Sequence, residues 1–224
     1  MSSIKQNIDN LLKALPSSVT LVAVTKTRSS EEALEAYNAG LRVFGENRVQ
    51  ELAAKKTLLP QDIQWHLIGH LQTNKVRHAV AAASMIESVD SIRLLEALNS
   101  EALRQERVID CLLQVHIATE ETKSGFAAGE IEQTDWASVS AALGALRIRG
   151  LMGMATYTED TDKVRSEFRS LARLFSETRE RCFSGNPLFT HLSMGMSGDW
   201  KVAVEEGSTM IRIGTLIFGE RIIE

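Results

Sequence analysis

The chain has 224 residues, of which 44% are hydrophobic and 24% charged, and its formal net charge at pH 7 is −4. This length fits one large domain or two small ones, and the composition excludes the membrane, fibrous and disordered classes. The net acidic charge and the scattered basic residues predict neither a nucleic-acid nor a membrane partner. Cys111 and Cys182 lack CxxC and metal-ligand spacing, so we expect free, buried thiols in a reducing compartment.

The first 15 residues predict an amphipathic helix rather than an export signal. Their apolar residues recur at helical spacing: Ile4, Ile8, Leu11, Leu12 and Leu15. The segment has no unbroken apolar stretch and no small-residue cleavage site. We therefore expect a cytoplasmic protein.

After this helix, short β-branched apolar runs alternate with longer amphipathic patterns. The apolar runs predict eight strands, at 20–24, 42–44, 65–68, 85–88, 109–117, 148–152, 190–192 and 210–213. The helical patterns begin near Ser29, Arg48, Thr73, Ser91, Thr134, Thr161 and Trp200. Such alternation is typical of repeated βα units around a parallel sheet.

Local signals support this series of elements. Ser29 and Thr161 are each followed by acidic residues, so they supply a side-chain acceptor and negative charge for a helix N-terminus. The longest pattern, 162–182, places its apolar residues along one helical face. Eight strands with intervening helices favour a single α/β domain over residues 1–224, a (β/α)8 TIM-like barrel with an extra N-terminal helix. A doubly wound open sheet is the alternative.

Lys26 is the first candidate functional residue. In a βα barrel the functional groups lie at the C-terminal ends of the strands. Lys26 closely follows the apolar run 21–24, so its amine lies at the rim of an apolar barrel. There desolvation lowers a lysine pKa and leaves more of the neutral amine that forms an imine. From position alone, a lysine that ends a strand and reaches solvent is the simpler interpretation.

Two glycine-containing loops near the C-terminus form the second candidate feature. Barrels often bind phosphate in the loops after strands 7 and 8. Here the first loop contains Ser197 and Gly198, and the second contains Gly214 and Thr215. Glycine lets the backbone approach an anion closely, and the hydroxyls add donors. Either loop alone could be an ordinary turn, but both together predict a phosphate site. With an imine-forming lysine they suggest pyridoxal phosphate.

Arg212 lies in the last predicted strand, two residues before Gly214. Alternation along the strand points both residues into the barrel mouth. A buried guanidinium needs a hydrogen-bond acceptor, and the sequence leaves two candidate acceptors open. One is a pyridine nitrogen, which the guanidinium would keep unprotonated and which would then be a weaker electron sink. The other is a barrel carboxylate such as Glu46.

Seven ordered segments closely resemble those of a known family, the pyridoxal phosphate homeostasis proteins (the YggS/PROSC family). They are AVTKT at 23–27, FGENRVQE at 44–51, WHLIGHLQTNK at 65–75, KSGF at 123–126, RGLM at 149–152, LSMGMSGD at 192–199 and GSTMIRIGTLIFG at 207–219. The resemblance runs from about residue 19 to residue 221 and is specific because the segments occur in one order.

The resemblance implies a fold type III barrel like the N-terminal domain of alanine racemase. It further implies pyridoxal 5'-phosphate held as an internal aldimine on Lys26, with Arg212 facing the pyridine nitrogen. The implied phosphate contacts are Ser197, Gly214 and Thr215. The implied lining residues are Asn47, Met194, Ser197 and Gly198.

Two functions follow from this resemblance. One is a non-catalytic carrier that buffers or delivers pyridoxal phosphate and serves amino-acid and keto-acid balance. The other is a racemase-like enzyme of low activity. In the resembling racemases a second domain supplies a catalytic tyrosine, and we expect that domain to be absent because the chain ends at Glu224. Tyr37 lies on a predicted helix, whereas Tyr157 follows the sixth strand on the functional face.

We therefore expect a carrier without catalytic residues. Its expected recipients are apo enzymes that use pyridoxal phosphate, or regulatory proteins. We expect a monomer, because no exposed heptad or long apolar helix face requires a partner. We expect no metal site, because His66 and His70 lack an obvious third ligand.

Overall fold

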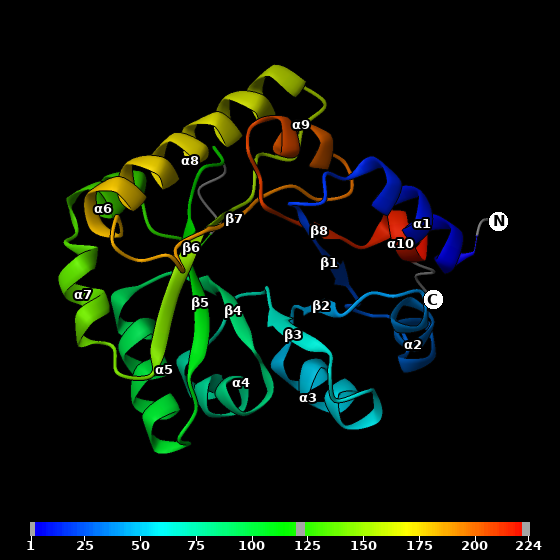
Figure 1. Ribbon diagram of the computed structural model, residues 1–224, viewed down its shortest axis with the longest axis horizontal. Helices are drawn as coiled ribbons and strands as arrows, with labels where there is room; N and C mark the ends of the chain where they lie inside the picture. The colour runs from blue at the N-terminus through cyan, green and yellow to red at the C-terminus, as the bar shows by residue number, and fades with distance from the viewer. Residues whose placement is uncertain (1–2, 120–123, 221–224) are drawn as a thin grey trace.

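The computed structural model describes residues 3–119 and 124–220. Eight parallel strands close into a barrel in sequence order, and helices surround it (Figure 1). The strands are β1 (Thr20–Val24), β2 (Val43–Glu46), β3 (Gln64–Leu67), β4 (Met85–Val89), β5 (Ile109–Val115), β6 (Leu146–Gly153), β7 (His191–Ser193) and β8 (Met210–Ile213). Because β1 pairs with β8 as well as with β2, the sheet has no open edge. The predicted (β/α)8 barrel is confirmed, and the open sheet is excluded.

The helices follow the predicted order with some differences at their ends. They are α1 (Ile4–Ala14), α2 (Ser30–Asn38), α3 (Val49–Leu58), the 3-10 helix η1 (Thr73–Lys75), α4 (Val76–Ala82), α5 (Ile92–Arg104), α6 (Ala128–Gln133), α7 (Trp136–Ala142), α8 (Thr161–Cys182), α9 (Trp200–Glu205) and α10 (Thr215–Phe218). The short helices α6 and α10 were not predicted, because one or two turns are too short to show a clear helical period.

Side-chain caps set the beginnings of several helices. Ser29 caps α2 in a capping box, in which its side chain accepts from Glu32 N while the Glu32 side chain accepts from Ser29 N. The N-cap of α8 is Asp160 rather than Thr161, because the Asp160 carboxylate accepts from Lys163 N at 3.0 Å. The helix therefore begins one residue before the predicted 162–182.

The larger part of the core lies between the barrel and the helices. It includes aromatic contacts such as Phe44 against Trp65, whose ring centroids are 5.7 Å apart. A second, smaller cluster fills the barrel interior: Val22, Met85, Leu112, Met152 and Met210. These side chains plug the barrel, so it is a packed core rather than a pore. A pocket at the strand C-termini therefore lies above this layer rather than passing through the barrel.

The two ends of the described chain meet beside the barrel. Helix α1 packs against α2 and α10, and the Asn7 side chain donates to Ile217 O at 2.9 Å (Figure 1). None of the helices in residues 3–119 and 124–220 has the length and apolar character needed to span a bilayer. Both cysteines are free, with Cys111 buried as expected and Cys182 only partly buried.

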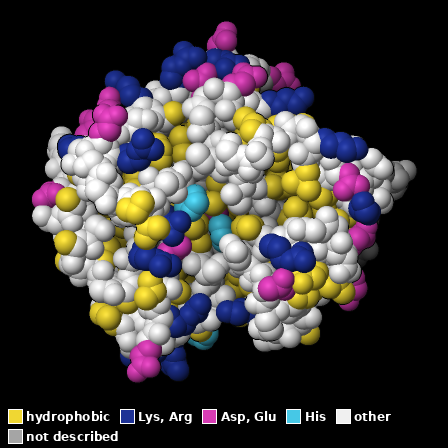
Figure 2. Space-filling model, in the orientation of Figure 1, with side chains coloured by type: hydrophobic (Ala, Val, Ile, Leu, Met, Phe, Trp, Pro, Cys, Tyr) yellow, Lys and Arg dark blue, Asp and Glu magenta, His cyan; other side chains and the backbone are white. Residues whose placement is uncertain are grey.

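Charged side chains of both signs are interspersed around the rim of the face seen in Figure 2. On α8, for example, Arg165 and Arg169 each pair with Glu206, at 2.9 and 3.0 Å. This surface agrees with the scattered charges of the sequence.

Candidate functional site

A pocket of about 770 Å3 opens at the C-terminal ends of the strands. Seven of the predicted site residues line it: Lys26, Asn47, Ser197, Gly198, Arg212, Gly214 and Thr215. They come from β8 and from the segments that follow β1, β2, β7 and β8, so closure of the barrel brings both ends of the sequence together. The pocket is the place where Lys26, the buried Arg212 and the two glycine-containing loops meet.

Met194 lies elsewhere. Its side chain is fully buried in the core between the barrel and the helices, whereas the pocket lining includes Met154 and Met196. Alternation explains the difference, because Ser193 at the end of β7 faces the barrel interior and the next residue faces outward.

Arg212 lies on the floor of the pocket and is only 4% exposed. Its Nη1 donates to Ser193 Oγ at 2.5 Å and its Nη2 donates to Gly153 O at 3.0 Å. Ser193 Oγ in turn donates to Glu87 Oε2 at 2.6 Å, and the same carboxylate oxygen lies 3.8 Å from Arg212 Nη1. Glu87 Oε1 lies 2.7 Å from His66 Nδ1. This buried network fixes the guanidinium from below.

The charges in this network stabilise one another. Burial lowers the pKa of Arg212 below its ordinary value, and the charge of the Glu87 carboxylate offsets only part of that shift. Burial alone would raise the pKa of Glu87, but the hydrogen bond and charge of His66, followed by Arg212 and Ser193, bring it below its ordinary value. Glu87 is therefore the counter-charge of Arg212.

Glu46, the carboxylate suggested by the sequence as the ion-pair partner of Arg212, is not that partner. Its Oε1 pairs with Lys55 Nζ of α3 at 2.6 Å. The reason is strand alternation: a Cβ on Gly45 would lie 3.0 Å from Val22 Cγ1 of the barrel interior. Gly45 thus faces inward, and the next residue faces the helices.

The two loops proposed to hold phosphate lie side by side. Leu216 N, in the first turn after β8, points at Ser197 Oγ of the other loop at 3.5 Å. Gly195 has φ 98°, and a Cβ there would lie 2.6 Å from Ala203 Cβ, so the loop after β7 requires glycine. Gly198 has open space around it. Ser197 and Gly198 of one loop and Gly214 and Thr215 of the other line the pocket.

Gln114 and Ile68 line the pocket but were not among the candidates from the sequence. Gln114 on β5 is 5% exposed, and its amide donates to Ser124 O at 2.6 Å. Gly69 also lines the pocket, and a Cβ on Gly69 would lie 2.3 Å from Asn47 O. Alternation along the predicted strands could have found Gln114, whereas the contact at Gly69 depends on how two strand ends meet.

The two tyrosines differ in position. Tyr37 on α2 donates to Asp62 Oδ1 at 2.8 Å and is remote from the pocket, as predicted. Tyr157 lies in the pocket lining but is 96% exposed, which places it at the outer rim. Among the residues that the structure describes, no group of three His, Cys, Asp or Glu side chains could hold a metal ion.

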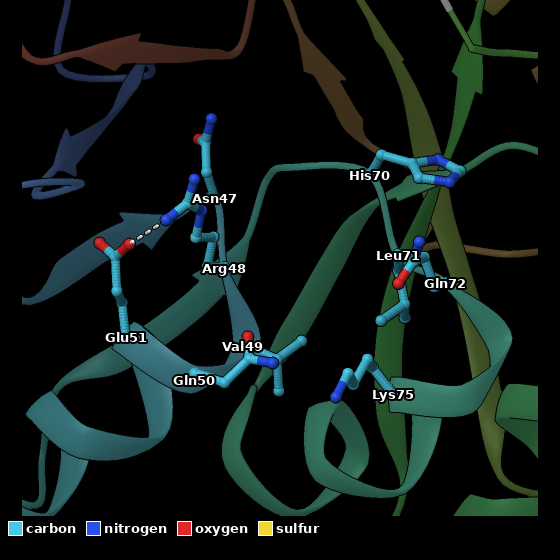
Figure 3. A pocket seen from close by; sticks show the side chains of 9 residues that line it. All are labelled: Asn47, Arg48, Val49, Gln50, Glu51, His70, Leu71, Gln72 and Lys75. Carbon is cyan, nitrogen blue, oxygen red and sulfur yellow. Dashed lines mark ion pairs between the residues drawn. The ribbon is translucent and has the colours of Figure 1, made fainter.

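A second pocket of about 560 Å3 adjoins the first and shares Asn47 and His70 with it (Figure 3). Its remaining lining comes from the start of α3 and from the segment leading into α4. At the start of α3, Arg48 and Glu51 form an ion pair at 3.7 Å. Helix α3 thus begins directly beside the main pocket.

Comparison with known proteins places the chain among its relatives. The family described as alanine racemase, N-terminal domain, matches residues 1–222. The pyridoxal phosphate homeostasis protein of Aquifex aeolicus is 40% identical, covering 90% of this chain and 86% of the relative. That of Vibrio alginolyticus is 38% identical over 99% of both chains.

Solved structures agree with the barrel. PipY of Synechococcus elongatus with PLP bound has a TM-score of 0.87 and 38% identity, covering 97% of this chain and 100% of that chain. Alanine racemase of Clostridium difficile 630 has a TM-score of 0.75 at 12% identity, and this likeness shows the fold alone. The chain belongs to the pyridoxal phosphate homeostasis protein family, whose barrel is that of the alanine racemase N-terminal domain.

Proposed function

We propose that this protein binds pyridoxal 5'-phosphate through a Schiff base on Lys26 and acts in cofactor homeostasis as a carrier rather than as an efficient enzyme. The observation that carries the proposal is the meeting, in one pocket, of Lys26, the buried Arg212 and the two loops after β7 and β8. Relatives named as pyridoxal phosphate homeostasis proteins, and PipY with PLP bound, support the choice of ligand.

Each chemical group of this cofactor has suitable residues in the pocket. Lys26 is half-buried in the pocket, where its amine can react. Ser197, Gly214 and Thr215 offer hydroxyl and backbone N–H donors of the kind that bind a phosphate. A guanidinium has five N–H donors, and the hydrogen bonds to Ser193 and Gly153 leave others available for a ring nitrogen.

Arg212 also decides what chemistry the site favours. When bound, pyridoxal phosphate supplies an aldehyde for the Schiff base and a ring that can take up electrons. A ring nitrogen facing the charged Arg212 stays unprotonated, because a second positive charge beside the guanidinium is unfavourable. Glu87 reinforces this effect, because its carboxylate helps to keep Arg212 charged. The site therefore holds the cofactor while weakening its use in carbanion chemistry.

A carrier must also release its ligand. The rim residue Tyr157 is 96% exposed, so this side of the pocket faces solvent. We propose that exchange with apo enzymes that use pyridoxal phosphate takes place through this opening. The monomeric state and the cytoplasmic location stay predictions.

Transfer to an acceptor tests the carrier function. The loaded, desalted protein is mixed with an apo aminotransferase, and the recovery of transaminase activity is followed with time. We expect recovery with the wild type and with Lys13→Ala, which changes an exposed lysine of α1, but little with Lys26→Ala. An acceptor that stays inactive with loaded wild type would contradict delivery.

The racemase-like alternative rests on one observation, the presence of Tyr157 in the pocket lining. It predicts interconversion of L- and D-alanine by the loaded protein, with loss of this activity in Tyr157→Phe. The carrier proposal predicts no more turnover than free pyridoxal phosphate gives. Robust racemisation that depends on Tyr157 would replace the carrier by an enzyme.

A further inference from the structure

We propose that helix α3 positions Lys26 through a clamp formed by Glu46, Glu51 and Lys55. These three residues are positioning residues for Schiff-base formation, because they hold the backbone on both sides of Lys26 rather than touching the ligand. The inference rests on the proposed attachment of pyridoxal phosphate to Lys26.

The residue before Lys26 is held by a buried ion pair. Lys55 Nζ donates to Thr25 O at 2.6 Å and pairs with Glu46 Oε1 at 2.6 Å. Thr25 Oγ1 donates to the same carboxylate oxygen at 2.6 Å. The Lys55 and Glu46 side chains are 9% and 0% exposed. Both the carbonyl and the hydroxyl of Thr25 are thus fixed by groups shielded from water.

The residue after Lys26 is held by the same helix. Glu51 lies one turn before Lys55, and its Oε2 accepts from Thr27 N at 3.2 Å. Thr27 has φ 62°, a left-handed conformation that a β-branched residue rarely adopts. Such backbone persists only where the surroundings enforce it. Figure 3 shows Glu51 in the first turn of α3, beside the pocket.

The ion pair is costly, which argues against a role in stability alone. Burial raises the pKa of Glu46, and hydrogen bonds from Lys55 and Thr25 lower it only in part. Glu46 Oε2 has no hydrogen-bond partner within residues 3–119 and 124–220. A buried ion pair is often no more stabilising than apolar side chains of similar size. What Glu46 and Lys55 add is a fixed place for the Lys26 backbone.

This placement affects a covalent step. Lys26 Nζ attacks the aldehyde carbon, a C=N bond forms, and the carbonyl oxygen leaves as water with two protons from the neutral amine. The reaction needs the amine close to the aldehyde and correctly oriented. The ring and phosphate contacts come from β8 and from the loops after β7 and β8, on other elements. Loosening the clamp should therefore weaken the Schiff base while leaving those contacts in place.

Two ligands separate these effects. Pyridoxal phosphate can react with Lys26, whereas 4'-deoxypyridoxine 5'-phosphate has a methyl group in place of the aldehyde and binds only noncovalently. The test variant is Glu46→Gln/Lys55→Met, which removes both buried charges together and so leaves neither unpaired. The matched control is Lys56→Met on the same helix, where Lys56 Nζ donates to Ala82 O at 2.9 Å.

We expect the double variant to bind pyridoxal phosphate about tenfold more weakly than the wild type and to bind the deoxy analogue within about twofold of it. The Schiff-base absorption at saturating ligand should fall in parallel, and Lys56→Met should match the wild type. Glu51→Ala, at a partly exposed position, should show the same ligand dependence to a smaller degree. If the double variant does not fold, Glu51→Ala tests the clamp in its place.

Equal weakening for both ligands would overturn the clamp, because it would mean general damage to the pocket. Unchanged binding of both ligands would also overturn it. A different result would overturn the proposed attachment to Lys26. In that case Lys26→Ala would bind the two ligands with the same affinities as the wild type. Lys26→Ala is measured beside the other variants for this reason.

Discussion

At the scale of single residues, the arrangement around Arg212 shows how the fold prepares a site. The guanidinium is buried, and Ser193, Gly153 and Glu87 satisfy part of its hydrogen bonding and its charge. Its place in the strand was predictable from alternation. Glu87 was not predicted, because it lies in an apolar strand on the far side of the barrel and meets Arg212 only when the barrel closes.

Replacing Glu87 with Gln tests this pairing. The change keeps the shape of the side chain and removes its charge, so Arg212 stays buried without its counter-charge. We expect the free energy of unfolding of the cofactor-free protein at neutral pH to fall by about 3 kcal/mol. Urea denaturation followed by circular dichroism measures this value. An unchanged free energy would show that Arg212 does not depend on Glu87.

The same carboxylate predicts a pH dependence. Because the pKa of Glu87 in the folded protein lies below its ordinary value of 4.5, the contribution of Glu87 to stability is fully present above that value. It is lost as the pH falls through the lower, folded-state pKa. In a thermal denaturation series toward acid pH, the wild type should therefore lose stability more steeply than Glu87→Gln below 4.5. If the wild type and Glu87→Gln lost stability equally steeply toward acid pH, Glu87 would not be ionised in the folded protein.

At the scale of elements, the strands and the periodic helices were predictable, and the short helices α6 and α10 were not. Helix α8 and strand β8 were found from their apolar patterns, with ends within one residue of the structure. The pattern expected to begin near Thr134 is α7, which Asp135 caps, whereas α6 ends at Gln133 and was not predicted. Met194 was misplaced because a motif does not state which residues of a loop face inward.

The loop after β7 offers a matched pair of glycines. Gly195 has φ 98° and no room for a Cβ, whereas Gly198 has open space. Gly195→Ala should lower the free energy of unfolding of the cofactor-free protein by about 2 kcal/mol, and Gly198→Ala should leave it nearly unchanged. Thermal unfolding of the two variants compares them directly. Equal effects would show that the conformation at Gly195 is not required.

At the scale of the whole molecule, closure of the barrel connects the ligand to the entire fold. The pocket draws residues from β1, β5 and β8 and from loops around the ring, so a bound ligand stabilises the molecule as one unit. The barrel itself was predictable from eight alternating βα units. The side-chain contacts across the barrel could not be predicted, because they depend on the register around the closed sheet.

Ligand binding should therefore raise the melting temperature of the protein. A ligand at one hundred times its Kd adds about 2.7 kcal/mol to the free energy of unfolding. With pyridoxal phosphate we expect a clear shift for the wild type and for Lys13→Ala, and a much smaller one for Lys26→Ala at the same concentration. Differential scanning calorimetry provides the comparison. An equal shift in Lys26→Ala would mean that the lysine adds nothing to binding.

Borohydride reduction of the loaded protein tests the covalent attachment at Lys26 directly. Absorption spectra are recorded before and after reduction for the wild type and Lys26→Ala, and the modified peptide is identified by mass spectrometry. We expect a Schiff-base band in the wild type alone, and a reduced pyridoxyl group fixed on Lys26. A wild type that takes up no pyridoxal phosphate, or one modified at another lysine, would contradict this attachment.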